Sequence, residues 1–284
     1  MVMTEDELID GMLNIAFAED IGDGDHTTLC CIPAEEQGKM KLLVKEEGIL
    51  AGVDMALRVF HKFDPMLKVN VLLHDGTPVK PGDIAFYVEG KTQSLLQTER
   101  LVLNLMQRMS GIATMTHKYV EELKGLHTRV LDTRKTTPGL RIIEKQAVKI
   151  GGGVNHRIGL FDMILLKDNH IDFAGGIANA INKAHEYLKA KGKDLKIEIE
   201  VRDMNELEQV MKIGGVNRIM LDNFSTEQTK EAVKRIGGKY ETESSGGITF
   251  KTLRSYAECG VDYISVGALT HSVKGLDMSL KATD

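Results

Sequence analysis

Residues 132–141 read Asp132-Thr133-Arg134-Lys135-Thr136-Thr137-Pro138-Gly139-Leu140-Arg141. They follow the apolar stretch at 129–131, and the Pro-Gly pair prevents a strand from continuing. Three cations and three threonine hydroxyls therefore share one strand-to-loop turn. Arginine provides a planar fork of donors and lysine a compact charge, so this turn is typical of a site that binds several carboxylate or phosphate oxygens. A solvated charged loop is the alternative.

From residue 129 onward, short apolar strands alternate with helical segments. We expect strands at 129–132, 163–166, 197–201, 218–221, 240–243 and 263–266, and the clearest helices at 177–191, 204–213, 226–236 and 250–259. Such alternation indicates parallel strands joined by right-handed crossovers. The number of units favours an incomplete or modified barrel, and periodicity alone leaves an open doubly wound sheet as the alternative.

The first third of the chain has a different pattern, typical of a small mixed α/β unit. A capping box at Thr4 and Glu7 predicts a helix to about residue 19, followed by a loop at 22–28. Strands are expected at 39–45, 67–73 and 84–88, with a helix at 55–63. A long apolar helical stretch at 94–124 comes next, and we expect it to break or bend near Gly111 and to link the two halves.

Composition limits the classes of function. The chain has 284 residues, 42% of them hydrophobic, and a net charge of −5. It is long enough for two domains, and it has no overall basic field that would favour nucleic acid or an anionic membrane. The three cysteines, two of them adjacent, favour neither a disulfide framework nor a zinc site, so we expect a cytoplasmic protein. We find no secretory signal and no apolar run that approaches the roughly 18 residues of a membrane span.

Each expected strand carries or is followed by polar residues or glycine. These are Thr133-Arg134-Lys135, Lys167-Asp168-Asn169-His170, Glu198 and Glu200 with Arg202-Asp203, Asp222-Asn223-Phe224, Glu243-Ser244-Ser245-Gly246-Gly247 and Gly267-Ala268-Leu269-Thr270-His271-Ser272. A single such residue is more often a helix cap or a solvated side chain. Because the carboxyl ends of parallel strands meet at one rim, the whole set favours a functional site there.

Three groups of residues at or near these strand ends suggest specific chemistry. The glycine-rich segments Ser245-Gly246-Gly247 and Val266-Gly267-Ala268 are typical of a phosphate cradle, with a plain tight turn as the alternative. Glu200 and Asp222 offer hard oxygens suited to Mg²⁺, or they form ion pairs with basic residues across the rim. His156 and Arg157 follow a run of three glycines and add donors to Arg134, Lys135 and Lys167. So many cations in one place imply a ligand with several negative groups.

At this point the motifs resemble the quinolinate phosphoribosyltransferase family, also called nicotinate-nucleotide pyrophosphorylase (carboxylating). The segments that carry the resemblance are DTRKTTPGLR at 132–141, GGGVNHRIGL at 151–160, KDNHI at 167–171, LDNF at 221–224, ESSGGI at 243–248 and YISVGALTHS at 263–272, with EDIGDGDHTT at 19–28 and QTER at 97–100. Together, in this order, they cover nearly the whole chain.

The resemblance implies an α/β fold of the type II phosphoribosyltransferases. Its N-terminal α/β sandwich domain would span 1–112 and be joined by the C-terminal tail at 271–284. A TIM-like α/β barrel of six or seven parallel strands would span 113–270.

The resemblance also implies the reaction. A decarboxylating pentosyltransferase of this kind converts quinolinate and phosphoribosyl pyrophosphate to nicotinate mononucleotide, CO₂ and pyrophosphate in NAD biosynthesis. It would need Mg²⁺ and no organic cofactor, would bind neither nucleic acid nor membrane, and would form a homodimer or a higher homo-oligomer.

By motif position, the resemblance implies three sets of site residues. Quinolinate would contact Arg134, His156, Arg157 and Lys167, together with Thr133 and with Arg100 from the partner subunit. Phosphoribosyl pyrophosphate would contact Lys135, Glu200, Asp222, Ser245, Gly246, Gly247, Val266, Gly267, Ala268 and His271. The catalytic residues would be Lys135, Lys167, Glu200 and Asp222, with Glu200 and Asp222 holding Mg²⁺ mainly through pyrophosphate and water.

Three alternatives stay open on the sequence. A paralogue from the molybdenum-associated branch would keep the scaffold and accept another substrate. A Schiff-base aldolase would use Lys167 as its amine. A non-catalytic nucleotide-binding protein would have no use for Glu200 and Asp222 beside the cations.

Overall fold

The structure is a computed structural model that describes residues 3–283. The chain forms two compact units. Unit 1 comprises Met1–His117, Thr136–Gly152 and Leu269–Asp284, and unit 2 comprises Lys118–Lys135 and Gly153–Ala268. The chain therefore crosses between the units four times, after residues 117, 135, 152 and 268.

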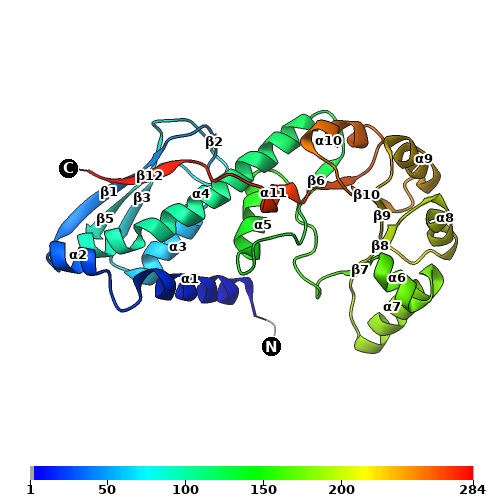
Figure 1. The fold of residues 1–284 in the computed structure, drawn as a ribbon, viewed down its shortest axis with the longest axis horizontal. Helices are drawn as coiled ribbons and strands as arrows, with labels where there is room; N and C mark the ends of the chain where they lie inside the picture. Colours follow the sequence, from blue (N-terminus) through cyan, green and yellow to red (C-terminus); the bar gives the residue numbers. More distant parts are fainter. Residues whose placement is uncertain (1–2, 284) are drawn as a thin grey trace. The chain divides into compact units, whose positions relative to one another are not determined.

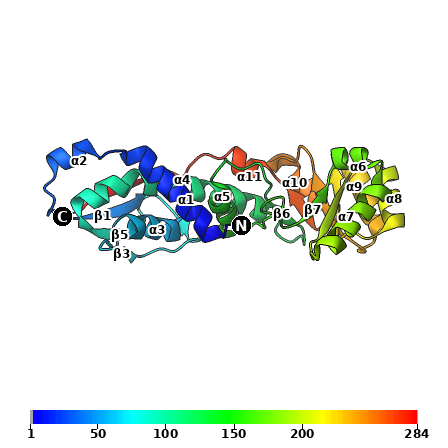
Figure 2. The ribbon, with the colours of Figure 1, turned by 90° about the horizontal axis from the view of Figure 1, so that it is seen from below.

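Unit 1 is built on a four-stranded antiparallel sheet. Its order is β12 (Met278–Ala282), β1 (Gln37–Val44), β5 (Ile84–Lys91) and β3 (Lys68–Val71). In β1, buried Met40, Leu42 and Val44 alternate with Lys39 and Lys41, so one face packs on the core and the other meets solvent. The strands and helices of this unit are seen in Figure 1 and, after a quarter turn, in Figure 2. A short pair, β2 (Gly48–Ile49) and β4 (Pro78–Val79), completes its strands.

The helices of unit 1 are α1 (Glu5–Ile21), α2 (His26–Cys31), α3 (Val53–Phe63), α5 (Arg141–Ile150) and the first part of α4 (Thr92–Glu122). The capping box at Thr4 and Glu7 is present, so the predicted start of α1 is confirmed. The expectation of a loop at 22–28 is wrong for its last three residues, which belong to helix α2. Asp25 caps a short helix there by accepting a hydrogen bond from the Thr28 amide at 3.1 Å.

The expected break in the long helix does not occur. Helix α4 is continuous over 31 residues and runs past Gly111. The glycine is needed for close packing instead, because a Cβ at this position would collide with the carbonyl oxygen of Lys274.

Unit 2 is built on six parallel strands. Their order is β6 (Arg129–Leu131), β11 (Tyr263–Ser265), β10 (Glu241–Ser245), β9 (Arg218–Asp222), β8 (Ile197–Val201) and β7 (Ile164–Leu166). The first and second strands of the unit thus lie at opposite edges of the sheet. Only an isolated bridge between Leu131 and Val154 extends the pairing at β6 among the described residues. The sheet is an incomplete barrel, as the sequence predicted.

The helices of unit 2 surround the curved row of strands on the outside (Figure 1). They are α6 (Asp168–Ala174), α7 (Ile177–Lys191), α8 (Met204–Ile213), α9 (Thr226–Ile236) and α10 (Phe250–Ala257), followed by the short α11 (Ala268–His271), which ends in unit 1. Since an open doubly wound sheet has helices on both faces, this arrangement favours the barrel. All five residues of β8 are buried, because one face meets the helices and the other the interior.

Candidate active site

The predicted site residues of unit 2 lie at the carboxyl ends of its strands. Lys167 follows β7, Glu200 lies in β8, Asp222 and Ser245 end β9 and β10, and Val266 follows β11. Because these strands are parallel and adjacent, their ends form one rim. The fold therefore brings these side chains to one end of the barrel.

Two arginines of the predicted anion site interact electrostatically. Arg134 and Arg157 are both half-buried. Burial lowers the pKa of Arg157, and the positive charge of Arg134 lowers it further. Arg157 is fixed by a 3.2 Å hydrogen bond from its guanidinium to the carbonyl of Met163. Two cations that repel each other in a partly desolvated place favour the binding of an anion between them.

Lys167 and Glu200 form an ion pair. The Lys167 Nζ lies 2.9 Å from Glu200 Oε2, and Glu200 is buried. Asp222, on the next strand, accepts a 2.6 Å hydrogen bond from Asn223. The two carboxylates fit a magnesium–pyrophosphate group as hard oxygen donors. Glu200 also neutralises the charge of Lys167, with which it forms the ion pair.

The segment Ser245-Gly246-Gly247 has a backbone that only glycine adopts readily. Gly246 and Gly247 have φ values of +96° and +61°. A Cβ at Gly246 would collide with the side chain of Asn223, and the backbone N–H of Asn223 donates to the Ser245 carbonyl at 2.9 Å. This tight turn exposes Gly247 to solvent just ahead of α10, as a phosphate cradle requires.

The second predicted cradle segment is tied into the sheet at its first residue. The Val266 amide donates to Leu131 O at 2.9 Å, so it joins the ends of β11 and β6. Val266 is buried, while Gly267 and Ala268 are half-buried. This leaves the latter two as the part of the segment that can meet a ligand.

His156 is fixed at both ring nitrogens. Its Nδ1 accepts a 2.7 Å hydrogen bond from the Arg157 amide, so the ring proton lies on Nε2. That Nε2 lies 3.1 Å from Glu198 Oε2 and 3.6 Å from Glu243 Oε2. The backbone is held as well, because fully buried Asp132 accepts from the His156 amide at 2.8 Å. The His156 ring therefore orients Arg157 by accepting the hydrogen bond from the Arg157 backbone amide.

A charged layer around Arg218 lies inside the barrel. Sequence analysis counted Glu198 and Glu243 among the polar residues of the strands, but it gave no role to Arg218 or Glu241. Arg218 contacts Glu243 at 3.1 Å and Glu241 at 3.0 Å, with Glu198 4.0 Å away, and it stacks over the ring of Tyr263. Burial raises the pKa of Glu198 to about 7. It raises the pKa of Glu243 to about 8, and the neighbouring Glu198 raises it further. The signal was the alternation of charged and other residues along strands β8 and β10.

Three side chains in this layer have the residue types and the spacing of metal ligands. Ligand atoms of His156, Glu198 and Glu243 all lie within 4.8 Å of one another. Arg218 already supplies a positive charge to these carboxylates. The arrangement is therefore an internal ion-pair layer that holds His156.

The remaining predicted residues have more exposed positions. Lys135 is exposed, and its amide donates to Thr133 Oγ1 at 3.0 Å. Arg100 on α4 and His271 at the end of α11 are exposed and belong to unit 1. The His271 ring contacts the Ser272 hydroxyl at 2.6 Å.

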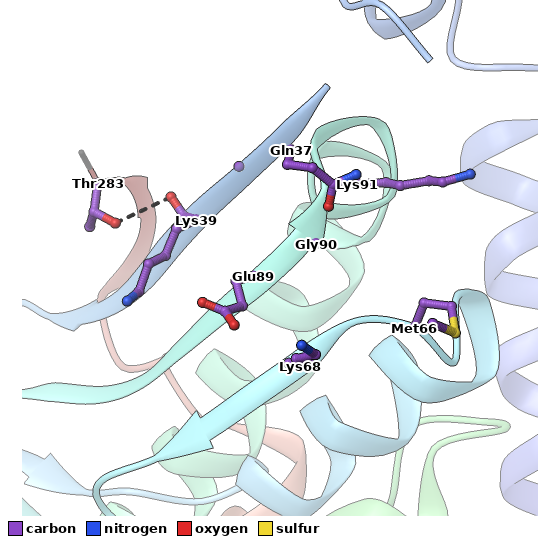
Figure 3. A pocket seen from close by; sticks show the side chains of 9 residues that line it. Gln37, Lys39, Met66, Lys68, Glu89, Gly90, Lys91 and Thr283 are labelled. Atoms are coloured by element: carbon purple, nitrogen blue, oxygen red, sulfur yellow. Dashed lines mark hydrogen bonds between the residues drawn. The ribbon is translucent and has the colours of Figure 1, made fainter. Parts of the chain in front are cut away.

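Unit 1 has a separate surface hollow of about 640 Å³ over one end of its sheet (Figure 3). The figure shows Lys39 and Lys68 on either side of Glu89, while the Lys91 side chain points away from it. None of the residues that line this hollow is buried. Exposed lysines around one carboxylate are typical of a solvated sheet face, so we assign it no ligand.

The helices among the described residues were compared with the requirements of a membrane span. Among residues 3–283, no helix combines the length and the apolar character that crossing a bilayer requires.

Comparison with known proteins gives consistent matches along the chain. A family model described as quinolinate phosphoribosyl transferase, N-terminal domain, matches residues 25–110, and one described as the C-terminal domain of the same enzyme matches residues 112–281. A relative from Nicotiana tabacum, quinolinate phosphoribosyltransferase (decarboxylating) 1b, is 43% identical over 95% of this chain and 81% of its own length. A relative from Bacillus subtilis, probable nicotinate-nucleotide pyrophosphorylase (carboxylating), is 42% identical over 96% of this chain and 92% of its own length. The crystal structure of NadC from Streptococcus pyogenes has a TM-score of 0.92 and 40% identity, and each chain is covered over 100% of its length.

Proposed function

Because the chain belongs to the quinolinate phosphoribosyltransferase family, we propose that it converts quinolinate and phosphoribosyl pyrophosphate to nicotinate mononucleotide, CO₂ and pyrophosphate in NAD biosynthesis. The observation that carries this proposal is the group of partly desolvated cations at the end of the barrel. Arg134 lowers the pKa of Arg157 in the absence of a ligand, and a dicarboxylate relieves that repulsion.

Quinolinate binds in this proposal through its two carboxylates. Arg134, Arg157 and Lys167 provide the charged donors, with Thr133 beside them in the turn after β6. His156 belongs to the same set, and its ring fixes the Arg157 amide at 2.7 Å. Arg100 completes the set from the partner subunit.

Phosphoribosyl pyrophosphate binds along the other strand ends. Ser245, Gly246 and Gly247 cradle the 5′-phosphate with Val266, Gly267 and Ala268, and His271 follows them in the chain. Lys135 faces the pyrophosphate, and Glu200 and Asp222 contact the ribose hydroxyls. Mg²⁺, bound mainly to pyrophosphate and water near Glu200 and Asp222, would neutralise charge on the leaving group.

The residues contribute positioning and electrostatics. As pyrophosphate leaves, positive charge grows on the ribose carbon, and the carboxylates of Glu200 and Asp222 stabilise it. The pyridine nitrogen attacks that carbon and becomes cationic. The electron pair of the breaking bond to the 2-carboxylate then stays on that ring carbon as CO₂ departs, and the carbon takes up a proton from solvent to give nicotinate mononucleotide. Lys167, paired with Glu200 at 2.9 Å, links the two binding regions.

The test is a turnover assay with quinolinate, phosphoribosyl pyrophosphate and Mg²⁺ that follows nicotinate mononucleotide and CO₂ together. We expect equal amounts of both products, none without Mg²⁺, and none when nicotinate replaces quinolinate. A folded protein that makes no product would contradict this function and favour a paralogue with another phosphoribosyl acceptor.

The assembly and the location belong to the same proposal. We propose a homodimer, or a higher homo-oligomer, in the cytoplasm. Large apolar side chains on the surface of unit 2 support a subunit contact: Leu160, Phe161 and Phe173 are 72%, 59% and 91% exposed.

The Schiff-base alternative for Lys167 is less favoured. That mechanism needs an unpaired amine, whereas Lys167 forms an ion pair with Glu200.

A further inference from the structure

Two of the crossings between the units directly follow predicted substrate-binding residues. The chain leaves unit 2 after Lys135 and enters unit 1 at Thr136. It does so again after Ala268, entering unit 1 at Leu269. A contact that fixes the first residues of these two unit 1 segments therefore also restricts the position of the residues just before them. Those residues are Lys135 and the Val266-Gly267-Ala268 segment.

One side chain of unit 1 contacts the chain just after both crossings. The Arg108 guanidinium, on α4, donates from the same nitrogen to Thr137 Oγ1 at 2.7 Å and to Thr270 O at 3.1 Å. Thr137 and Thr270 each lie one residue beyond the first residue of their unit 1 segment. These segments are more than a hundred residues apart in sequence, and Arg108 joins them.

Glu144 holds Arg108 in place. The Arg108 Nε donates to Glu144 Oε1 at 2.7 Å, and the carboxylate has no exposed surface. The other carboxylate oxygen accepts from the Thr137 amide at 3.1 Å. Glu144 thus binds the guanidinium and the loop together, a geometry that suits the planar fork of arginine and not the single ammonium of lysine.

We propose that Arg108, held by Glu144, is a positioning residue for phosphoribosyl pyrophosphate: it fixes Thr137 and Thr270 and so sets where Lys135 and the Gly267-Ala268 backbone meet the substrate. The proposal rests on the proposed function, because that function assigns Lys135 and this segment to the pyrophosphate and phosphate groups. A buried ion pair is weak evidence for a role in stability alone, since apolar packing often stabilises as well.

The chain offers a matched control within the same unit. Arg58 donates to Asp10 at 2.9 Å and to the Asp6 carbonyl, and it is as exposed as Arg108. It contacts neither crossing. Arg58→Met therefore removes an equally exposed arginine without touching either substrate-binding segment, although its carboxylate partners are more exposed than Glu144.

The experiment compares full-length Arg108→Met, Arg108→Lys, Thr137→Val and Arg58→Met with the wild type. It measures KM for each substrate, kcat, the unfolding midpoint, and phosphoribosyl pyrophosphate binding by calorimetry. We expect Arg108→Met to raise KM for phosphoribosyl pyrophosphate about tenfold to a hundredfold with a smaller change for quinolinate, because a displaced substrate group loses most of its binding geometry. Thr137→Val should shift the same constant by a smaller factor at an unchanged midpoint. Arg108→Lys should recover only part of the loss.

The outcomes separate this proposal from the proposed function. A folded Arg108→Met protein with an unchanged KM for phosphoribosyl pyrophosphate would overturn it, whatever its unfolding midpoint. If Arg108→Met does not fold, Thr137→Val decides, and an unchanged KM there overturns it too. If the wild type makes no nicotinate mononucleotide, the proposed function fails, whereas weaker calorimetric binding of phosphoribosyl pyrophosphate by Arg108→Met still supports the positioning role.

Discussion

At the scale of one residue, the binding role proposed for Arg134 and the stability of the chain oppose each other. Its charge lowers the pKa of the neighbouring Arg157, and so it destabilises the folded chain when no anion is bound. A residue that costs stability through such repulsion is typical of a binding site, where function outweighs stability.

The first prediction concerns this trade-off. Arg134→Ala should lower quinolinate affinity at least about a hundredfold, because it removes a charged, bidentate donor. The same change should keep or raise the unfolding midpoint by about 1–3 °C without substrate, since the repulsion on Arg157 is relieved. Calorimetric titration and thermal melting measure the two effects. Lys183→Ala, an exposed lysine of α7 in the same unit, is the control and should change neither. A lower midpoint with unchanged affinity would contradict the assignment of Arg134.

The second prediction concerns the pH dependence of stability. Glu198 and Glu243 have pKa values of about 7 and about 8 in the folded chain, above the ordinary 4.5. Between pH 4.5 and 8 the folded state therefore binds more protons than the unfolded state, and the free energy of unfolding falls as pH rises. Glu243→Gln should reduce this fall and raise the unfolding midpoint at pH 8 by about 2–4 °C. Equal slopes for variant and wild type from pH 5 to 8 would contradict it.

The charged layer around Arg218 also shows what could not be predicted at this scale. The sequence displays charged residues at every second position of two strands. Which of them meet depends on sheet order and register, and these pair Arg218 with Glu198 on one side and Glu241 on the other. The two roles of the His156 ring nitrogens depend on the same three-dimensional arrangement. By contrast, the residues at the strand ends could be predicted, because parallel strands bring their carboxyl ends to one rim.

At the scale of elements, predictions succeeded where a local pattern determines the structure. Helices α7, α8 and α9 have the predicted bounds, since each combines an apolar stripe with a glycine directly after its last residue. The break predicted in α4 was wrong, because the role of Gly111 depends on a segment more than 150 residues away. Helix α2 was missed because its six residues are held by one cap.

The third prediction tests the turn after β10. Gly246→Ala combines a left-handed φ with a collision against Asn223, so it should displace the cradle and raise KM for phosphoribosyl pyrophosphate by at least about tenfold. Gly237→Ala is the matched control. It has a φ of +58° at the end of α9, and a Cβ there would meet only carbonyl oxygens at 3.8 Å or more. It should cost about 1–2 kcal/mol of stability with unchanged KM. Equal KM values for the two variants would contradict the phosphate role of this turn.

At the scale of the whole molecule, the family resemblance drawn from the sequence is confirmed by the matching family models. The chain crosses between its units four times. A single cut after residue 112 would therefore leave the unit 1 segments 136–152 and 269–284 on the same piece as unit 2. Which segments join which unit could not be predicted from composition or periodicity, because those patterns report local structure.

The fourth prediction tests whether Arg100 serves a neighbouring subunit. Arg100→Ala and Lys167→Ala should each be inactive as homodimers. Mixed after denaturation and refolding, they should recover about a quarter of wild-type activity, because half of the dimers are then mixed and each has one complete site. Activity of refolded mixtures, with each variant refolded alone as the control, measures this. No recovery from correctly sized dimers would show that Arg100 acts within its own subunit.

The sheet of unit 1 places β12 directly beside β1. During translation β1 emerges long before β12, with all of unit 2 made between them. A nascent chain therefore carries an unpaired sheet edge throughout the synthesis of its barrel. The four-stranded sheet of unit 1 therefore reaches its final form only after β12 has left the ribosome, and a chaperone that shields strand edges would act on β1 until then.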